Sequence, residues 1–135
     1  MNPLSHFQQL LTAAASQPEP HRLLFVFANA ELPADATAEQ QARFHAGEGG
    51  ALAPVMCVDK APGELSSFAD LAMESRNTGA AWSMVFAAGL GGQGGQPPAR
   101  AEVDAALQIM VEAVRDGGFG RFAAYGPEGE PVIFD

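Results

Sequence analysis

The feature that most constrains the fold is an apolar run over residues 80–88, which leads through a glycine-rich segment into a strongly periodic helix. The run AAWSMVFAA is typical of a strand. Residues 89–98, GLGGQGGQPP, then form a connection. From Arg100 to Asp116 apolar side chains recur on one helical face, and two glycines follow, which predicts a helix with a C-terminal cap. A strand, a glycine loop and a helix in this order indicate mixed α and β structure.

The rest of the chain continues this alternation. Helical periodicity follows a capping or turn signal in three further stretches, residues 5–16, 37–46 and 65–75. Strands are predicted over residues 23–28 and 53–58, and a hairpin over residues 121–134. Residues 23–28 are all apolar without alternation, which predicts a strand that is buried on both faces.

The order of these elements predicts the fold class. Alternating helices and strands are typical of right-handed β-α-β crossovers on a parallel sheet. A chain of 135 residues also fits one domain. We therefore predict a single α/β domain over residues 1–135, with a mixed, mostly parallel sheet of about five strands, flanking helices and a C-terminal β-hairpin. The alternative is an α+β two-layer sandwich, with an antiparallel sheet and helices on one face.

The charge of the chain restricts its partners. Sixteen acidic side chains against seven basic ones give a formal net charge of -9, and the basic residues are spread singly. Nucleic acids and anionic membranes are therefore disfavoured. The chain begins without the features of a secretory signal, and no apolar run reaches the ~20 residues of a membrane helix. Cys57 is the single cysteine and cannot form an intramolecular disulfide. We expect a cytoplasmic protein with no membrane and no nucleic-acid partner.

The glycine-rich segment contains a G-x-G-x-x-G pattern at Gly89, Gly91 and Gly94. Such glycines let backbone amides approach a phosphate, and a following helix adds its positive end. Here Pro97 and Pro98 separate the pattern from the helix, and no Gly-Lys-Ser/Thr follows. The favoured interpretation is a mobile surface loop, with a phosphate site as the alternative.

A second argument uses the strand ends. If the first three strands are parallel, the residues beyond their carboxyl ends share the edge where ligands bind in open α/β sheets. The ligand-binding residues predicted in this way are Asn29, Glu31, Asp59, Lys60, Gly89, Gly91 and Gly94. The alternative is that these are ordinary polar connections.

The other chemically distinctive residues point to structure. Cys57 lies in an apolar strand and is expected to be a small buried hydrophobe. The histidines lack the spacing of metal ligands, so we predict no metal, no cofactor and no catalytic residue. Trp82 is expected to be a core residue or an anchor of a subunit interface.

Four segments carry a resemblance to a known family: residues 22–28, 47–52, 56–60 and 91–95. On these the chain resembles a family of small uncharacterised proteobacterial proteins, sometimes labelled automatically as a ribonucleotide reductase alpha subunit. The label does not fit, because such an enzyme needs several cysteines and a large barrel, whereas this chain has Cys57 alone. The resemblance implies no catalytic motif.

Two functions follow from the sequence. The first is a non-catalytic cytoplasmic interaction domain, which associates with itself as a homodimer or with a protein partner. The second is a binder of a small metabolite or phosphorylated ligand, or a minor enzyme, that uses the connections after the first three strands.

Overall fold

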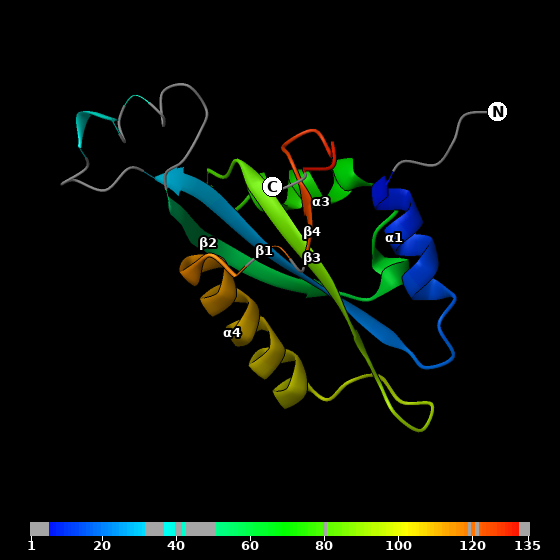
Figure 1. Ribbon diagram of the computed structural model, residues 1–135. Helices are drawn as coiled ribbons and strands as arrows, with labels where there is room; N and C mark the ends of the chain where they lie inside the picture. The colour runs from blue at the N-terminus through cyan, green and yellow to red at the C-terminus, as the bar shows by residue number, and fades with distance from the viewer. Residues whose placement is uncertain are drawn as a thin grey trace.

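The molecule is built around one antiparallel sheet with the strand order β2-β1-β3-β4 (Figure 1). The computed structural model describes residues 6–31, 37–39, 42, 51–79, 81–118, 120 and 122–132. Its strands are β1 (His21–Glu31), β2 (Ala51–Lys60), β3 (Met84–Gly91) and β4 (Ala123–Tyr125). Its helices are α1 (His6–Ala15), α3 (Phe68–Arg76) and α4 (Arg100–Asp116), and a 3-10 helix, η1, spans Pro62–Glu64.

The strand directions overturn the predicted α/β fold with its mostly parallel, five-stranded sheet. β1 pairs antiparallel with both β2 and β3, and β3 pairs antiparallel with β4. β2 and β3 therefore run in the same direction and are joined through α3, but β1 lies between them. Such a split β-α-β unit has the same order of elements along the chain as a unit of neighbouring parallel strands. The class is α+β, as in the alternative prediction, although helices cover both faces of the sheet.

The central strand β1 supplies side chains to two separate core clusters. These are Leu23, Phe25 and Phe27 on one face of the sheet and Leu24, Val26 and Ala28 on the other. All six side chains are at most 2% exposed. Because successive side chains of a strand point to opposite faces, a strand covered on both faces shows no alternation. The prediction of a strand buried on both faces is confirmed.

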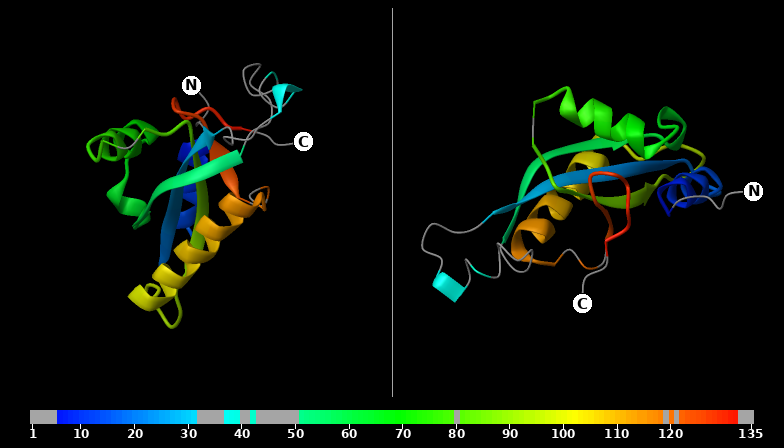
Figure 2. Two further views of the ribbon diagram at one scale, coloured as in Figure 1. Left: turned by 90° about the vertical axis from the view of Figure 1, so that its left-hand side faces the viewer. Right: turned by 90° about the horizontal axis from the view of Figure 1, so that it is seen from above.

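The helices divide between the two faces. α1 and α3 cover the face of Phe25, where Phe7, Leu11 and Leu71 complete the cluster. α4 covers the opposite face through Val103, Leu107, Met110 and Val114. In Figure 2 (left) the sheet lies between α3 and α4. Full burial of one such side chain contributes about 1.5–3 kcal/mol, so these clusters determine which side of each helix faces the sheet.

The helix α4 has the limits that the sequence predicts. It runs from Arg100 to Asp116 and is capped by Gly117, whose φ of 87° suits glycine. The helix has 17 residues. One side of it is buried against the sheet, and the outer side carries charged residues. Neither α4 nor any other helix within the described residues is long and apolar enough to cross a lipid bilayer.

Other predicted elements are shifted or only partly covered. β3 ends at Gly91, so two of the glycines predicted to lie in a loop belong to a strand. A turn after β4 brings Pro131 back beside Tyr125, which is the part of the predicted hairpin within the described residues. The helix predicted over residues 37–46 falls largely outside them.

Candidate functional site

One end of the sheet collects four of the predicted ligand-binding residues. Asp59 and Lys60 pair with β1 near its first residues. Gly89 and Gly91 pair with the same end of β1 from the other side. An antiparallel sheet thus places the ends of β2 and β3 beside the beginning of β1.

Asn29 and Glu31 lie at the opposite end of β1, where they pair with Ala53 and Ala51. The length of β1 between Leu23 and Asn29 is about 20 Å at roughly 3.3 Å per residue. The expected convergence of all these residues at one edge therefore does not occur, because it requires parallel strands.

Asp59 binds two arginines. Nε and Nη2 of Arg22 lie 2.9 and 2.5 Å from its Oδ2, and Nη2 of Arg100 lies 3.0 Å from its Oδ1. Burial by itself raises the pKa of Asp59, but the hydrogen bonds and positive charges of Arg100 and Arg22 outweigh it and hold the pKa below the ordinary 3.8. The carboxylate joins β2, β1 and the first turn of α4, and its charge is matched within the chain.

Lys60 makes a second connection from β2. Its Nζ lies 2.8 Å from Oε2 of Glu74 on α3, and the Lys60 side chain is 19% exposed. Asp59 and Lys60 therefore tie β2 to helices on opposite faces of the sheet.

The glycine-rich segment after β3 forms a tight turn. Gln93 and Gln96 pair across it, and Gly94 and Gly95 have φ values of 60° and 79°. Positive φ at both central residues favours glycine. A Cβ on Gly92 would overlap the backbone carbonyl of Gln96, so the close approach of the two backbones also requires glycine there.

Two amides of this segment donate hydrogen bonds to the chain before β1. The N–H of Gly95 donates to Oε2 of Glu19 at 2.7 Å. The N–H of Gly92 donates to the carbonyl oxygen of Pro20 at 2.8 Å. Consecutive amides in a turn attract anions, and the anion that the Gly95 amide binds is the carboxylate of Glu19.

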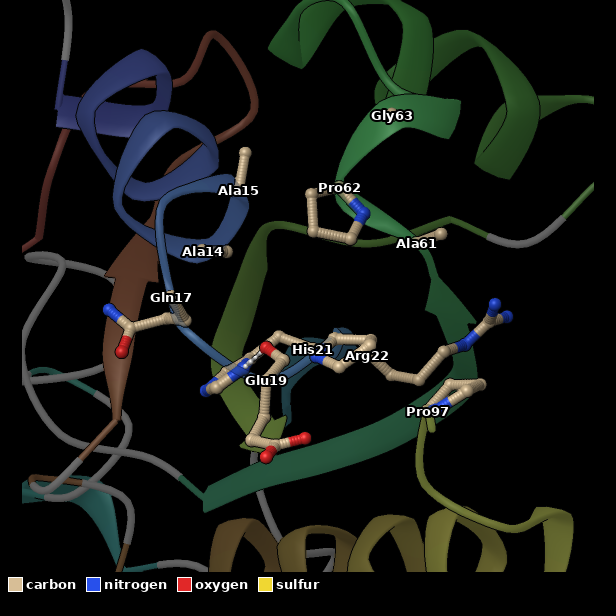
Figure 3. Close-up of a pocket in the computed structure, with 11 residues that line it drawn as sticks. Ala14, Ala15, Gln17, Glu19, His21, Arg22, Ala61, Pro62, Gly63 and Pro97 are labelled. Carbon is tan, nitrogen blue, oxygen red and sulfur yellow. Dashed lines mark hydrogen bonds between the residues drawn. The ribbon is translucent and has the colours of Figure 1, made fainter. Parts of the chain in front are cut away.

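A pocket with a volume of about 410 Å³ opens beside this turn, where α1 ends and β1 begins (Figure 3). We call it the His21 pocket. Its apolar wall consists of Ala14, Ala15, Pro20, Ala61, Pro62 and Pro97, and its polar side chains are Gln17, Glu19, His21 and Arg22. An apolar wall with a few polar groups, at this volume, is typical of small-molecule sites.

His21 is one of the polar residues that line the pocket. Its Nδ1 lies 2.9 Å from the backbone carbonyl oxygen of Glu19. Because a carbonyl oxygen only accepts, Nδ1 carries the proton of this bond, and Nε2 of the neutral ring is an acceptor. The ring lies close over β3, since a Cβ on Gly91 would be 3.0 Å from it. Glycine at position 91 therefore makes room for the imidazole.

Arg22 is one of the residues that line the pocket. In Figure 3 this side chain runs away from Glu19 and His21. Its Nε and Nη2 bind Asp59, and its Nη1 lies 3.3 Å from Oε1 of Glu64. Two carboxylates thus neutralise the guanidinium outside the pocket.

Trp82 is partly buried and packs against the core. Its ring lies edge-on to Phe27 and Phe68, and its Nε1 donates to Oγ of Ser75 at 2.7 Å. Ser75 donates in turn to the carbonyl oxygen of Ala72. These contacts give Trp82 a structural role in the core between α3 and the sheet; its role as an interface anchor stays a prediction.

Cys57 is exposed, although the sequence predicts that it is buried. The reason is that β2 is an edge strand, so an apolar run there is covered less completely than the run in β1. Across the residues that the structure describes, no three His, Cys, Asp or Glu side chains form a group that could hold a metal ion.

The His21 pocket lies apart from the site predicted from the sequence, because that prediction concerns the carboxyl ends of strands and the pocket lies where β1 begins. Glu19, His21 and Arg22 lie at the boundary directly before the buried run of β1. In an antiparallel sheet, such a boundary lies beside the ends of the two neighbouring strands. The polar residues between Pro18 and Leu23 are the signal in the sequence that could have indicated it.

No protein-family model, curated protein or solved structure matches this chain.

Proposed function

We propose that this protein binds a small molecule in the His21 pocket. The observation that carries the proposal is the pocket itself, which combines an apolar wall with the Glu19 carboxylate and the imidazole of His21. The backbone hydrogen bonds of Gly92 and Gly95 fix the Pro20 carbonyl and the Glu19 carboxylate before any ligand arrives. A preorganised site of this kind loses little side-chain entropy on binding.

Binding is favoured over catalysis by the groups around the pocket. Among the described residues that line it there is no serine, threonine, cysteine or lysine that could act as a nucleophile, and the Glu19 carboxylate and the His21 imidazole each already bind a backbone group of the protein. The phosphorylated ligand predicted from the glycine pattern is not part of this proposal, because the Gly95 amide already binds Glu19.

We place the protein in the cytoplasm, a proposal that its single cysteine supports.

Filling the pocket tests the proposal. Ala15 lines it at the exposed end of α1, whereas Ala13 is exposed on the same helix and does not line it. A metabolite collection is screened by thermal shift against the native chain, A15W and A13W. A ligand of the pocket raises the apparent melting temperature of the native chain and A13W and leaves A15W unchanged. Stabilisation of A15W by the same compounds, or no compound that stabilises the native chain, contradicts the proposal.

A second candidate function, self-association, is favoured by an apolar hollow on the other face of the sheet. The hollow has a volume of about 320 Å³ and lies between α4 and β3, where Leu24, Leu90, Met110 and Phe122 contribute to it. Ile109 stands at this hollow and is 57% exposed. Exposed apolar surface beside a hollow is typical of protein interfaces.

Light scattering after size-exclusion chromatography tests this candidate. The native chain is expected to have the mass of a dimer at micromolar concentration, and I109K is expected to be a monomer. Gln108 is the exposed neighbour of Ile109 and is not a lining residue of the hollow, so Q108K is the control for the added charge. A monomeric native chain, or a dimeric I109K, rejects self-association through this surface.

A further inference from the structure

We infer that the ligand of the His21 pocket is an alkylammonium compound, a positively charged amine on a short aliphatic chain. This inference rests on the proposed function of the pocket. It follows from three features: the hydrogen-bond acceptors among the lining residues, the electrostatic potential of the surrounding elements and the apolar wall.

The first feature is a pair of acceptors. The N–H of Gly95 donates to Oε2 of Glu19, and within the part of the chain that the structure describes Oε1 of this partly buried carboxylate is left for a further donor. Nε2 of His21 is also an acceptor when the ring is neutral, because Nδ1 donates to the Glu19 carbonyl. An ammonium group has three donors and no acceptor, so it suits a site whose lining offers a carboxylate and a ring nitrogen as acceptors.

The second feature is the electrostatic potential. Ala14 and Ala15 belong to the last turn of α1, whose carbonyl end carries a partial negative charge, and this turn contains no basic residue. Of the lining residues only His21 and Arg22 are basic, and the guanidinium of Arg22 is neutralised by Asp59 and Glu64. The net charge of -9 adds attraction for a cation at long range.

The third feature is the apolar wall, in which Pro62 and Pro97 lie across the pocket from the end of α1 (Figure 3). Methylene groups gain free energy from burial against such a wall, whereas a fully hydrated inorganic cation does not. The wall thus favours an organic amine over a metal ion.

The test compares three probes that have similar chains and different charges: n-butylamine, n-butanol and butyrate. Each is titrated into the ¹⁵N-labelled protein at neutral pH, and the amide signals of His21 and Gly95 report binding. Butylamine is expected to bind at least about tenfold more tightly than butanol, because a hydrogen bond between two charged groups is stronger than a neutral one. Butyrate is expected not to bind in the pocket.

The charge of Glu19 is then removed by E19Q, which keeps a side-chain oxygen to accept from Gly95. The butylamine affinity is expected to fall at least about tenfold, with the butanol affinity unchanged. E102Q makes the same change in net charge at an exposed residue of α4 and is expected to keep the native affinity.

Three results overturn the inference. Butylamine binding that is equal in E19Q and the native chain shows that the carboxylate does not hold the amine. Binding of butanol or butyrate that is tighter than that of butylamine, and is blocked by A15W, removes the charge assignment but leaves the pocket as a binding site. No change of the pocket amides with any probe removes the inference, while the metabolite screen decides the proposed function separately.

Discussion

Replacement of Asp59 by asparagine tests how the end of the sheet beside the pocket is held together. The Asp59 side chain is 12% exposed, against 27% for Arg22 and 59% for Arg100. A hydrogen bond to a charged group contributes about 1.5–3 kcal/mol when it is buried, and an exposed ion pair contributes about 0–1 kcal/mol. D59N keeps one acceptor oxygen and loses the charge, so we expect a loss of about 1–2 kcal/mol at pH 7, mainly through Arg22.

The same loss is expected to depend on pH. The folded pKa of Asp59 lies below 3.8 because the hydrogen bonds of the two arginines outweigh the effect of burial. A carboxyl whose pKa is lower in the folded state adds stability above its unfolded pKa, and loses this contribution as the pH falls through the folded pKa. The difference between the native chain and D59N is therefore full at pH 7 and decreases as the pH falls below 3.8.

Urea unfolding followed by the fluorescence of Trp82 measures this difference, since unfolding exposes its ring to water. D104N is the matched control. Asp104 is 65% exposed, and of the arginines that the structure describes it binds Arg100 alone, so its loss is expected to have a smaller effect. An unfolding free energy that is equal in D59N and the native chain at pH 7, or a difference that stays constant down to pH 2, refutes the reasoning.

Three further predictions concern the turn, the tryptophan and the tyrosine. G92A is expected to lower the unfolding free energy by about 2 kcal/mol or more, because its Cβ would overlap the backbone of Gln96. G63A is the control, because a Cβ there meets nothing within 4 Å, and it is expected to have little effect. Equal melting temperatures of G92A and G63A contradict the backbone clash. S75A removes the acceptor of the Trp82 indole and is expected to cost about 1–2 kcal/mol, with a shift of the tryptophan emission; native emission and stability argue against this bond. Burial raises the pKa of Tyr125, so the neutral tyrosine stabilises the fold and this contribution is lost as the pH rises above 10. Y125F is expected not to lose stability in this way. Identical alkaline unfolding of Y125F and the native chain contradicts the prediction.

The sequence predicts the parts of the fold that depend on local chemistry. The apolar stripe of α4 and the glycine after it determine that helix because both act within a few turns of one another. The unbroken apolar run of β1 indicates cover on both faces, and both faces are covered. Strand direction is a different property, because it depends on pairing between distant segments. The sequence pattern of β2-α3-β3 is the same whether β2 and β3 are neighbours or another strand lies between these two strands.

The candidate site shows the same limit. Asp59 and Lys60 lie at the end of the sheet next to the glycine-rich turn, but they bind other side chains of the protein. Asn29 lies at the other end of the sheet because β1 is antiparallel to its neighbours β2 and β3. The acceptors of the pocket come from Glu19 and His21, whose importance depends on where the ends of β2 and β3 lie in space.

The position of β1 between β2 and β3 has a consequence for synthesis on the ribosome. β1 emerges early with six apolar residues, yet its first partner ends at Lys60 and its second partner ends only at Gly91. Until β3 has been made, one edge of the most hydrophobic strand has no native neighbour, and such edges pair readily with other chains. A nascent chain that stalls before Met84 is therefore expected to aggregate or to need a chaperone, whereas the completed chain closes the sheet around β1.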